Sequence, residues 1–151
     1  MIVAAGLTPA WQQILRFDVL RLGEVNRAVE AHWCASGKVF NVGIALSRLG
    51  ADCRLISPIG RDVAERVRRE LDDLGVCARL IEHSEGTRVC TTLLDPATCT
   101  VTELVENARL PSAELLARFV EAFVDEARAA EVVVLSGSLP AGVPTTLYRD
   151  L

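Results

Sequence analysis

Short apolar runs alternate with amphipathic segments along much of the chain. Residues 1–5 and 54–59 are apolar runs typical of buried strands. Residues 39–49 and 63–74 carry apolar side chains at the spacing of a helix with one buried face. Because strands that alternate with helices form right-handed β-α-β units, this order predicts an α/β fold with a mostly parallel sheet flanked by helices.

Glycines and small polar residues mark the expected ends of the helices. Gly50 and Gly75 follow the last apolar position of the first two helices and are expected to end them. Asp62 is expected to cap the second helix, and Ser112 to cap a third, longer one. The expected buried face of the third helix is Leu115, Leu116, Phe119, Phe123 and Val124.

The last predicted strand lies close to the end of the chain. Residues 131–135 are a β-branched apolar run, typical of a strand buried on both faces. Only a short segment follows, in which Pro144 could open another helix. We therefore expect one strand edge and part of an apolar face to be open.

Other segments are rich in β-forming residues without intervening helices. Residues 14–17 and 25–29 are predicted to be short, half-buried strands around a Leu-Gly-Glu turn at 22–24. Residues 76–81, 87–94 and 99–105 are further β-rich runs, separated by turn-forming residues.

Composition and charge exclude several classes of protein. Half of the residues are apolar and 24% are charged, which is typical of a folded domain. The net charge is −4, no segment concentrates Lys and Arg, and aromatics are 5%, so a nucleic-acid partner is not expected. The apolar runs are too short to cross a membrane, and the first residues lack the basic start of a signal peptide. Five scattered cysteines and two histidines predict a cytoplasmic protein with reduced thiols and no metal site.

The first candidate for chemistry is Ser36-Gly37-Lys38, just before a predicted helix. A glycine lets the backbone approach a ligand, and the helix start offers free N–H groups and a positive dipole end. Lys38, the only lysine of the chain, adds a mobile positive charge. The sequence thus indicates an anion pocket, although a solvated lysine after a turn is the simpler alternative. Val39 stands where a Walker P-loop requires Ser or Thr.

Further polar residues precede or follow predicted elements. Asn41 lies one helical turn from Lys38, and Arg88 follows a glycine turn and could bind a phosphate through its fork. Glu103 lies on a strand, and Ser138 lies in the loop after residues 131–135. Each has a simpler alternative as a helix-start residue, a surface side chain or part of an ordinary turn.

As an ordered set, these segments resemble one family, the PfkB/ribokinase family of carbohydrate kinases. The Gly-Ser-Leu-Pro segment and residues 22–27 are most similar to the branch with 1-phosphofructokinase and tagatose-6-phosphate kinase. The resemblance covers essentially all 151 residues and corresponds to the N-terminal half of a family member. The matching segments, in order, are residues 35–42, 49–50, 59–62, 87–88, 102–103 and 136–142.

The resemblance implies a fold and a reaction. The fold would be ribokinase-like and truncated: residues 1–151 as the substrate-binding part of a Rossmann-like domain, with a small β lid over about residues 11–34. The reaction would be ATP-dependent phosphorylation of a sugar phosphate, with ATP and Mg²⁺ as cofactors and a homodimer through the lid as a candidate assembly. The substrate-binding residues implied by position are Gln12, Gly37, Lys38, Asn41, Arg88, Glu103 and Ser138.

Three departures from the family pattern qualify this reading. The family's Gly-Gly-Lys-Gly is Ser-Gly-Lys-Val at residues 36–39, and Gln12 occupies the position of a sugar-binding Asp. The Gly-Ala-Gly-Asp motif that supplies the anion hole and the base is absent, so we expect no catalytic residue here and an ATP-binding half outside the chain. The alternative is a non-catalytic sugar-phosphate-binding or regulatory protein. A nucleoside or ribose kinase fits less well, since those substrates lack the phosphate that Lys38 and Arg88 are expected to hold.

Overall fold

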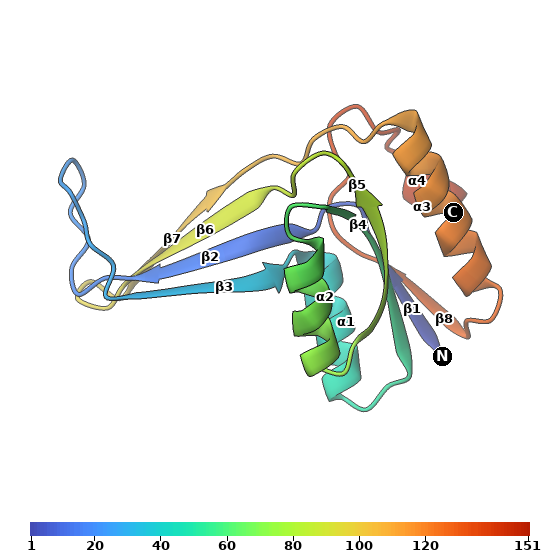
Figure 1. Cartoon of the computed structure of the whole chain (residues 1–151), viewed down its shortest axis with the longest axis horizontal. Helices are drawn as coiled ribbons and strands as arrows, with labels where there is room; N and C mark the ends of the chain where they lie inside the picture. Colours follow the sequence, from blue (N-terminus) through green and yellow to red (C-terminus); the bar gives the residue numbers. More distant parts are fainter.

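The first of two sheets is parallel and flanked by helices. A computed structural model describes all 151 residues. The parallel sheet has the order β5-β4-β1-β8 (Figure 1). Its strands are β1 (Ile2–Ala5), β4 (Cys53–Gly60), β5 (Cys77–His83) and β8 (Val132–Leu135). The predicted α/β fold with a parallel sheet flanked by helices is confirmed.

Helices cover both faces of this sheet (Figure 1). Helices α1 (Lys38–Arg48) and α2 (Ala64–Asp73) pack on one face, where Phe40 of α1 is fully buried. Helix α3 (Ala113–Ala127) packs on the other face through the fully buried Phe119, and the short α4 (Leu147–Asp150) follows β8. The core is therefore two apolar layers, one on each side of the sheet.

A second sheet projects from the first (Figure 1), and we call it the lid sheet. Its order is β3-β2-β6-β7, with β2 parallel to β6 and the other pairs antiparallel. The strands are β2 (Ala10–Arg16), β3 (Glu30–Ser36), β6 (Val89–Asp95) and β7 (Thr100–Val105). Residues 11–34 thus supply only two of its strands, because β6 and β7 join them from far along the chain.

The prediction of a strand at residues 25–29 is wrong. This segment lies in the connection at the tip of the lid sheet, and the strand begins at Glu30, where Arg16 and Glu30 pair in register and form an ion pair at 2.6 Å. The Asn26 side chain instead accepts a hydrogen bond from the Arg21 N–H at 2.8 Å and folds the tip into a turn. Local turn chemistry therefore prevails over the apolar residues there.

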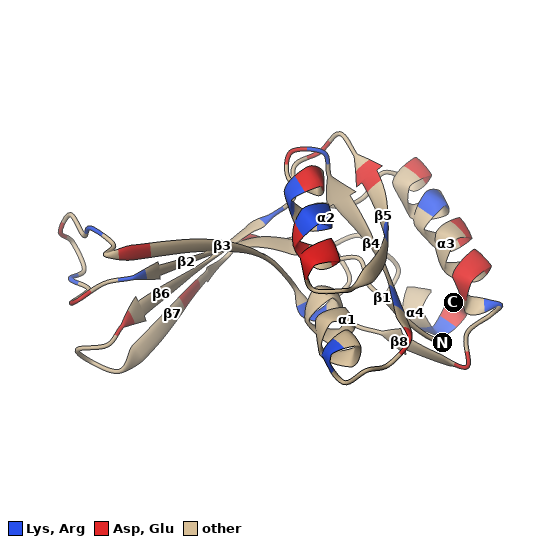
Figure 2. Ribbon diagram, turned by 60° about the horizontal axis from the view of Figure 1, so that its bottom comes forward, with Lys and Arg blue, Asp and Glu red and all other residues tan.

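Charged residues are unevenly distributed between the two parts. Each lid strand carries one charged side chain, whereas charges of both signs gather on α2 and α3 (Figure 2). The lid sheet is a single layer, and its edge strand β7 is exposed along its whole length.

Two expectations about helices need correction. Asp62 does not cap α2; its carboxylate instead accepts a hydrogen bond from the Thr87 N–H at 3.2 Å, and α2 begins after Val63 without a side-chain cap. Ser112 does cap α3 and accepts from the Leu115 N–H at 3.1 Å. Val124, expected in the core face of α3, is 39% exposed because it lies on the solvent side of that helix.

Strand β8 is not buried on both faces. It pairs only with β1, and its Val132 and Val133 are 51% and 40% exposed. No element of the chain lies along its other edge, so the apolar run is partly uncovered.

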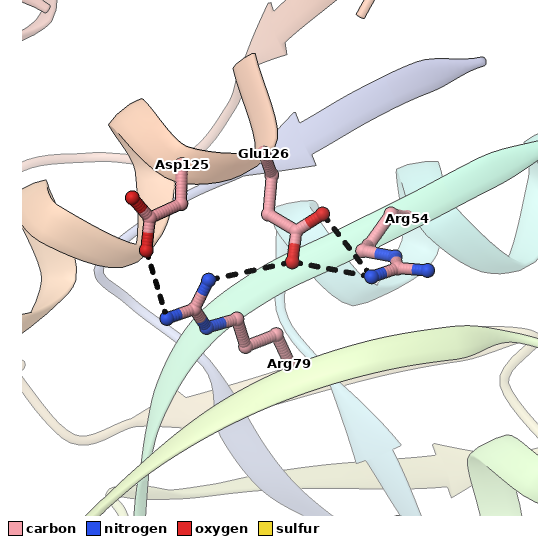
Figure 3. Close-up of polar contacts among 4 residues, drawn as sticks. All are labelled: Arg54, Arg79, Asp125 and Glu126. Carbon is pink, nitrogen blue, oxygen red and sulfur yellow. Dashed lines mark hydrogen bonds and ion pairs between the residues drawn. The ribbon is translucent and has the colours of Figure 1, made fainter. Parts of the chain in front are cut away.

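An ion-pair network holds α3 against the parallel sheet. Glu126 contacts Arg54 of β4 at 3.1 Å and Arg79 of β5 at 3.4 Å, and Asp125 contacts Arg79 at 3.3 Å (Figure 3). The bond to Glu126 raises the pKa of Arg54 further above its usual range. The network lies near the start of β4 and β5, away from the strand ends where ligands bind in such sheets.

None of the helices is long and apolar enough to span a membrane.

Candidate functional site

Three loops meet at the carboxyl ends of β1 and β8. They come together because three glycines leave no side chain between them. A Cβ at Gly6 would collide with the carbonyl oxygen of Ser136. Gly37 has φ +103°, and a Cβ there would lie 2.8 Å from the Thr8 carbonyl; Gly137 has φ +97° and approaches the Thr8 hydroxyl in the same way. In open α/β sheets, ligands bind at a switch point, where the connections from two adjacent parallel strands leave in opposite directions.

A cavity of about 340 Å³ opens between these loops and the lid sheet. This volume is in the range of small-molecule sites. All seven residues expected to bind substrate line it: Gln12, Gly37, Lys38, Asn41, Arg88, Glu103 and Ser138. Residues from five separate segments of the chain therefore converge on one cavity.

The start of α1 supplies the electropositive side. Gly37 is the N-cap, and no side chain caps the helix there, so N–H groups of the first turn lack a side-chain acceptor. Lys38 and Asn41 extend from the same turn and are exposed in the cavity wall. A helix start with an adjacent ammonium group is suited to an anion such as a phosphate.

Three neutral side chains of the lid sheet, Gln12, Ser36 and Thr92, form what we call the floor of the cavity. The Ser36 hydroxyl donates to Oε1 of Gln12 at 2.5 Å, and Nε2 of Gln12 donates to the Thr92 hydroxyl at 2.6 Å. These three residues lie on adjacent strands, and the amide is held between two hydroxyls. It retains one free N–H and one free acceptor position for a ligand.

Arg88 lies where the lid sheet joins the core, and it is already hydrogen-bonded. Its Nε, Nη2 and Nη1 atoms donate to the backbone carbonyls of Pro9, Thr8 and Glu106 at 3.1, 3.1 and 3.2 Å. A guanidinium has five N–H groups, so two are left for a ligand. Arg88 is therefore not a free surface side chain, because it is half-buried against the backbone.

The remaining candidates complete the wall of the cavity. Glu103 of β7 is exposed and lies opposite Thr92 in the strand register. Ser138 is exposed in the loop after β8. Thr92 is not among the residues expected from the sequence, because its place beside Gln12 depends on the parallel pairing of β2 with β6, which no local pattern indicates.

A second, smaller cavity shares Arg88 with the first. It has a volume of about 50 Å³, and His83, Arg88 and Arg109 are among its lining residues. Burial lowers the pKa of His83, and its Nδ1 is buried without a partner. Behind the site, Glu70 of α2 accepts a hydrogen bond from the Ala35 N–H at 2.8 Å, and burial raises the pKa of Glu70.

Comparison with known proteins gives one family and one fold. The chain matches the model of the pfkB family carbohydrate kinases over residues 5–151. A protein from Thermotoga maritima described as a possible 1-phosphofructokinase superposes with a TM-score of 0.88 at 20% identity, over 99% of this chain and 49% of that one. Phosphofructokinase-2 from Escherichia coli, in complex with fructose-6-phosphate, gives 0.84 at 22% identity, over 95% and 48%.

A more distant likeness comes from ribokinase of Thermotoga maritima, with a TM-score of 0.59 at 20% identity over 70% of this chain and 36% of that one. The fold is therefore ribokinase-like. The chain spans about half the length of the phosphofructokinase structures it matches.

Proposed function

The chain belongs to the pfkB family of carbohydrate kinases, and we propose that these residues form the sugar-phosphate-binding half of an ATP-dependent kinase. The proposed type is a 1-phosphofructokinase or tagatose-6-phosphate kinase. The observation that carries the proposal is the convergence of all seven candidate residues on one cavity of about 340 Å³.

The cavity wall combines two cationic side chains, Lys38 and Arg88, with neutral polar ones and the carboxylate of Glu103. Lys38, the start of α1 and the two free N–H groups of Arg88 would bind the existing phosphate of the sugar. Gln12, Asn41 and Ser138 would bind its hydroxyls, since amides and hydroxyls both donate and accept. Phosphoryl transfer depends mostly on positioning and on stabilising charge. In this proposal, these residues contribute the positioning of the acceptor sugar.

ATP and Mg²⁺ are proposed as cofactors on the strength of the family. The chain contains no Gly-x-Gly segment and no group of three or more His, Cys, Asp or Glu side chains that could hold a metal ion. We propose that the residues that bind ATP and Mg²⁺ lie mostly outside residues 1–151. A cytoplasmic location and a homodimer through the lid sheet belong to the same proposal. The exposed Trp33 and Leu104 of the lid sheet would be covered in such a dimer.

The same observation leaves a second candidate, a non-catalytic sugar-phosphate-binding or regulatory protein. One measurement distinguishes the two candidate functions. The purified 151-residue chain is mixed with a protein fragment that supplies a nucleotide site, such as the C-terminal half of a homologous kinase. Phosphoryl transfer to a sugar phosphate in the mixture supports the kinase. Binding without transfer, with every tested partner half, supports the second candidate.

Isothermal titration of the 151-residue chain tests sugar-phosphate binding itself. Fructose 1-phosphate, fructose 6-phosphate and tagatose 6-phosphate are compared with unphosphorylated fructose, which we expect to bind more weakly. Lys38→Ala should weaken binding of the preferred ester about tenfold, as for one charge-assisted hydrogen bond. Arg48→Ala, at the opposite end of α1, is the control and should bind normally. Equal affinity for fructose and its phosphates, or no effect of Lys38→Ala, would overturn the proposal.

A further inference from the structure

Four segments of the chain connect the lid sheet to the core; Arg88 belongs to one of them and contacts two others. It lies in the connection from β5 to β6. Its guanidinium donates to the carbonyls of Thr8 and Pro9 at 3.1 Å, in the connection from β1 to β2. It also donates to the carbonyl of Glu106 at 3.2 Å, where the chain leaves β7 for α3. One side chain thus holds together the entry to the lid sheet and the exit from it.

Backbone hydrogen bonds around Arg88 tighten the same junction. The Trp11 N–H donates to the Arg88 carbonyl at 3.0 Å. The Val89 N–H donates to the Glu106 carboxylate at 2.9 Å, and the Glu106 N–H donates to the Val89 carbonyl at 3.2 Å. Together with the three guanidinium bonds, these form what we call the Arg88 clamp.

An arginine is needed for this geometry. The three acceptors are carbonyls from two separate segments, and a planar guanidinium can reach all of them with N–H groups pointing in fixed directions. A lysine has one terminal nitrogen on a flexible stem and cannot hold three separated acceptors in one orientation. The buried position of Thr8 and Pro9 leaves their carbonyls dependent on such a donor.

Arg88 also lines the cavity, so the clamp and the cavity share one side chain, which has two N–H groups left for a ligand. We infer that Arg88 is a positioning residue that fixes the orientation of the lid sheet on the core and couples that orientation to an anion bound in the cavity. An anion that engages the free N–H groups fixes the guanidinium and thereby strengthens its bonds to both connections. The identity of the anion, a sugar phosphate, rests on the proposed function.

The chain contains its own reporter of this junction. Trp11 and Trp33 are its only tryptophans, and their rings stack with centroids 6.1 Å apart at the base of the lid sheet. Trp11 packs against the core cluster on the α1 and α2 side, whereas Trp33 is 46% exposed. Near-ultraviolet circular dichroism of this pair therefore reports on the base of the lid sheet.

Hydrogen exchange on Arg88→Lys tests the inference, because the variant keeps the charge and removes the fork. In the ligand-free protein we expect the Trp11, Val89 and Glu106 amides to exchange about tenfold faster than in wild type, as for one or two lost hydrogen bonds. The tryptophan dichroism should weaken. Arg48→Lys, an exposed arginine of α1, is the control and should change neither signal. Unchanged exchange at all three amides in Arg88→Lys would overturn the clamp.

Saturating fructose 6-phosphate tests the coupling. In wild type we expect the ester to slow exchange at the three amides but not at the tip around Leu22. In Arg88→Lys, at concentrations that saturate its weaker site, this protection should be lost. Protection that persists in Arg88→Lys overturns the coupling. If no phosphate ester binds wild type, the proposed function fails, while faster exchange in ligand-free Arg88→Lys still supports the clamp.

If Arg88→Lys does not fold, the coupling can still be tested on the wild-type protein. Titration with inorganic phosphate should then slow exchange at the clamp amides in proportion to occupancy. Binding of phosphate without any such protection overturns the coupling.

Discussion

The Thr92 hydroxyl lies 2.6 Å from Nε2 of Gln12, across the parallel pair of strands β2 and β6. With the Ser36 hydroxyl on the other side of the amide, this contact makes the floor of the candidate site neutral. The positive charges of Lys38 and Arg88 are therefore opposed within the cavity only by the exposed Glu103. A neutral floor favours a ligand that is itself an anion.

Replacing the amide by a carboxylate tests the role of this neutrality. We expect Gln12→Glu to weaken binding of a sugar phosphate by about 1 kcal/mol at low salt, because it adds a negative charge of nearly the same shape. The effect should shrink as salt screens the repulsion. Gln13→Glu is the matched control, since neighbouring residues of a strand face opposite sides of the sheet. Equal losses in the two variants, measured by titration calorimetry, would show that the floor has no special part in binding.

The network around Glu126 gives a prediction about stability. Glu126 is 14% exposed and contacts two arginines, so Glu126→Ala leaves both without their shared partner. We expect a loss of about 1–3 kcal/mol in the free energy of unfolding, measured in urea. Asp125 is 48% exposed and makes one contact, and Asp125→Ala should cost less than about 1 kcal/mol. Similar losses for both variants would contradict the central position of Glu126.

The half-buried imidazole of His83 gives a pH dependence with a defined sign. Burial lowers its pKa below the ordinary value of 6.5, so the unfolded chain takes up a proton first as the pH falls. The free energy of unfolding should therefore decrease as the pH falls below about 6.5, and continue to decrease down to the lowered pKa of the folded state. Burial raises the pKa of Glu70, so ionising Glu70 destabilises the fold. Between the ordinary and the raised pKa of Glu70, the free energy of unfolding therefore decreases as the pH rises, the opposite of the His83 effect.

Replacing His83 separates its contribution to the pH dependence from that of Glu70. His83→Gln should remove the decrease between pH 7 and the lowered pKa, while the contribution of Glu70 remains. His32 is exposed and lies 3.6 Å from Glu30, and His32→Gln is the control. Urea midpoints measured at half-unit steps of pH check this. A His83→Gln profile parallel to that of wild type would contradict the assignment.

The parallel sheet and its helices could be predicted because their signals are local. Apolar spacing located α1 and α2, and Gly50 and Gly75, at φ +78° and +69°, follow them as expected. The strand predicted at residues 25–29 was wrong because its apolar side chains lie at an exposed tip. The extent of the lid sheet could not be predicted either, since it depends on pairing between β2 and β6, about eighty residues apart in the chain.

The residues of the candidate site likewise divide into those that a local pattern predicts and those that depend on the fold. Gly37, Lys38 and Asn41 could be found because they lie within one loop and one helical turn. Thr92 and the clamp contacts of Arg88 required the three-dimensional structure, because each joins segments that no periodicity relates. The sequence alone shows that Gln12 stands where the family pattern has an Asp, whereas the two hydroxyls that hold its amide were found only in the fold.

The open edge of β8 predicts how the 151-residue chain behaves in solution. Val132 and Val133 are half exposed beside unpaired backbone groups, which is a template for pairing with another strand. Covering even ~400 Å² of apolar surface there would contribute up to about 10 kcal/mol, as much as the net stability of a whole domain. We therefore expect the chain to self-associate or to bind a hydrophobic dye.

Val132→Lys should reduce both effects, because a lysine on an edge strand opposes pairing. Val124→Lys, at an exposed position of α3, is the control and should leave association unchanged. Sedimentation velocity and dye fluorescence measure the two effects. A monomer that binds no dye would show that the edge of β8 does not need a partner.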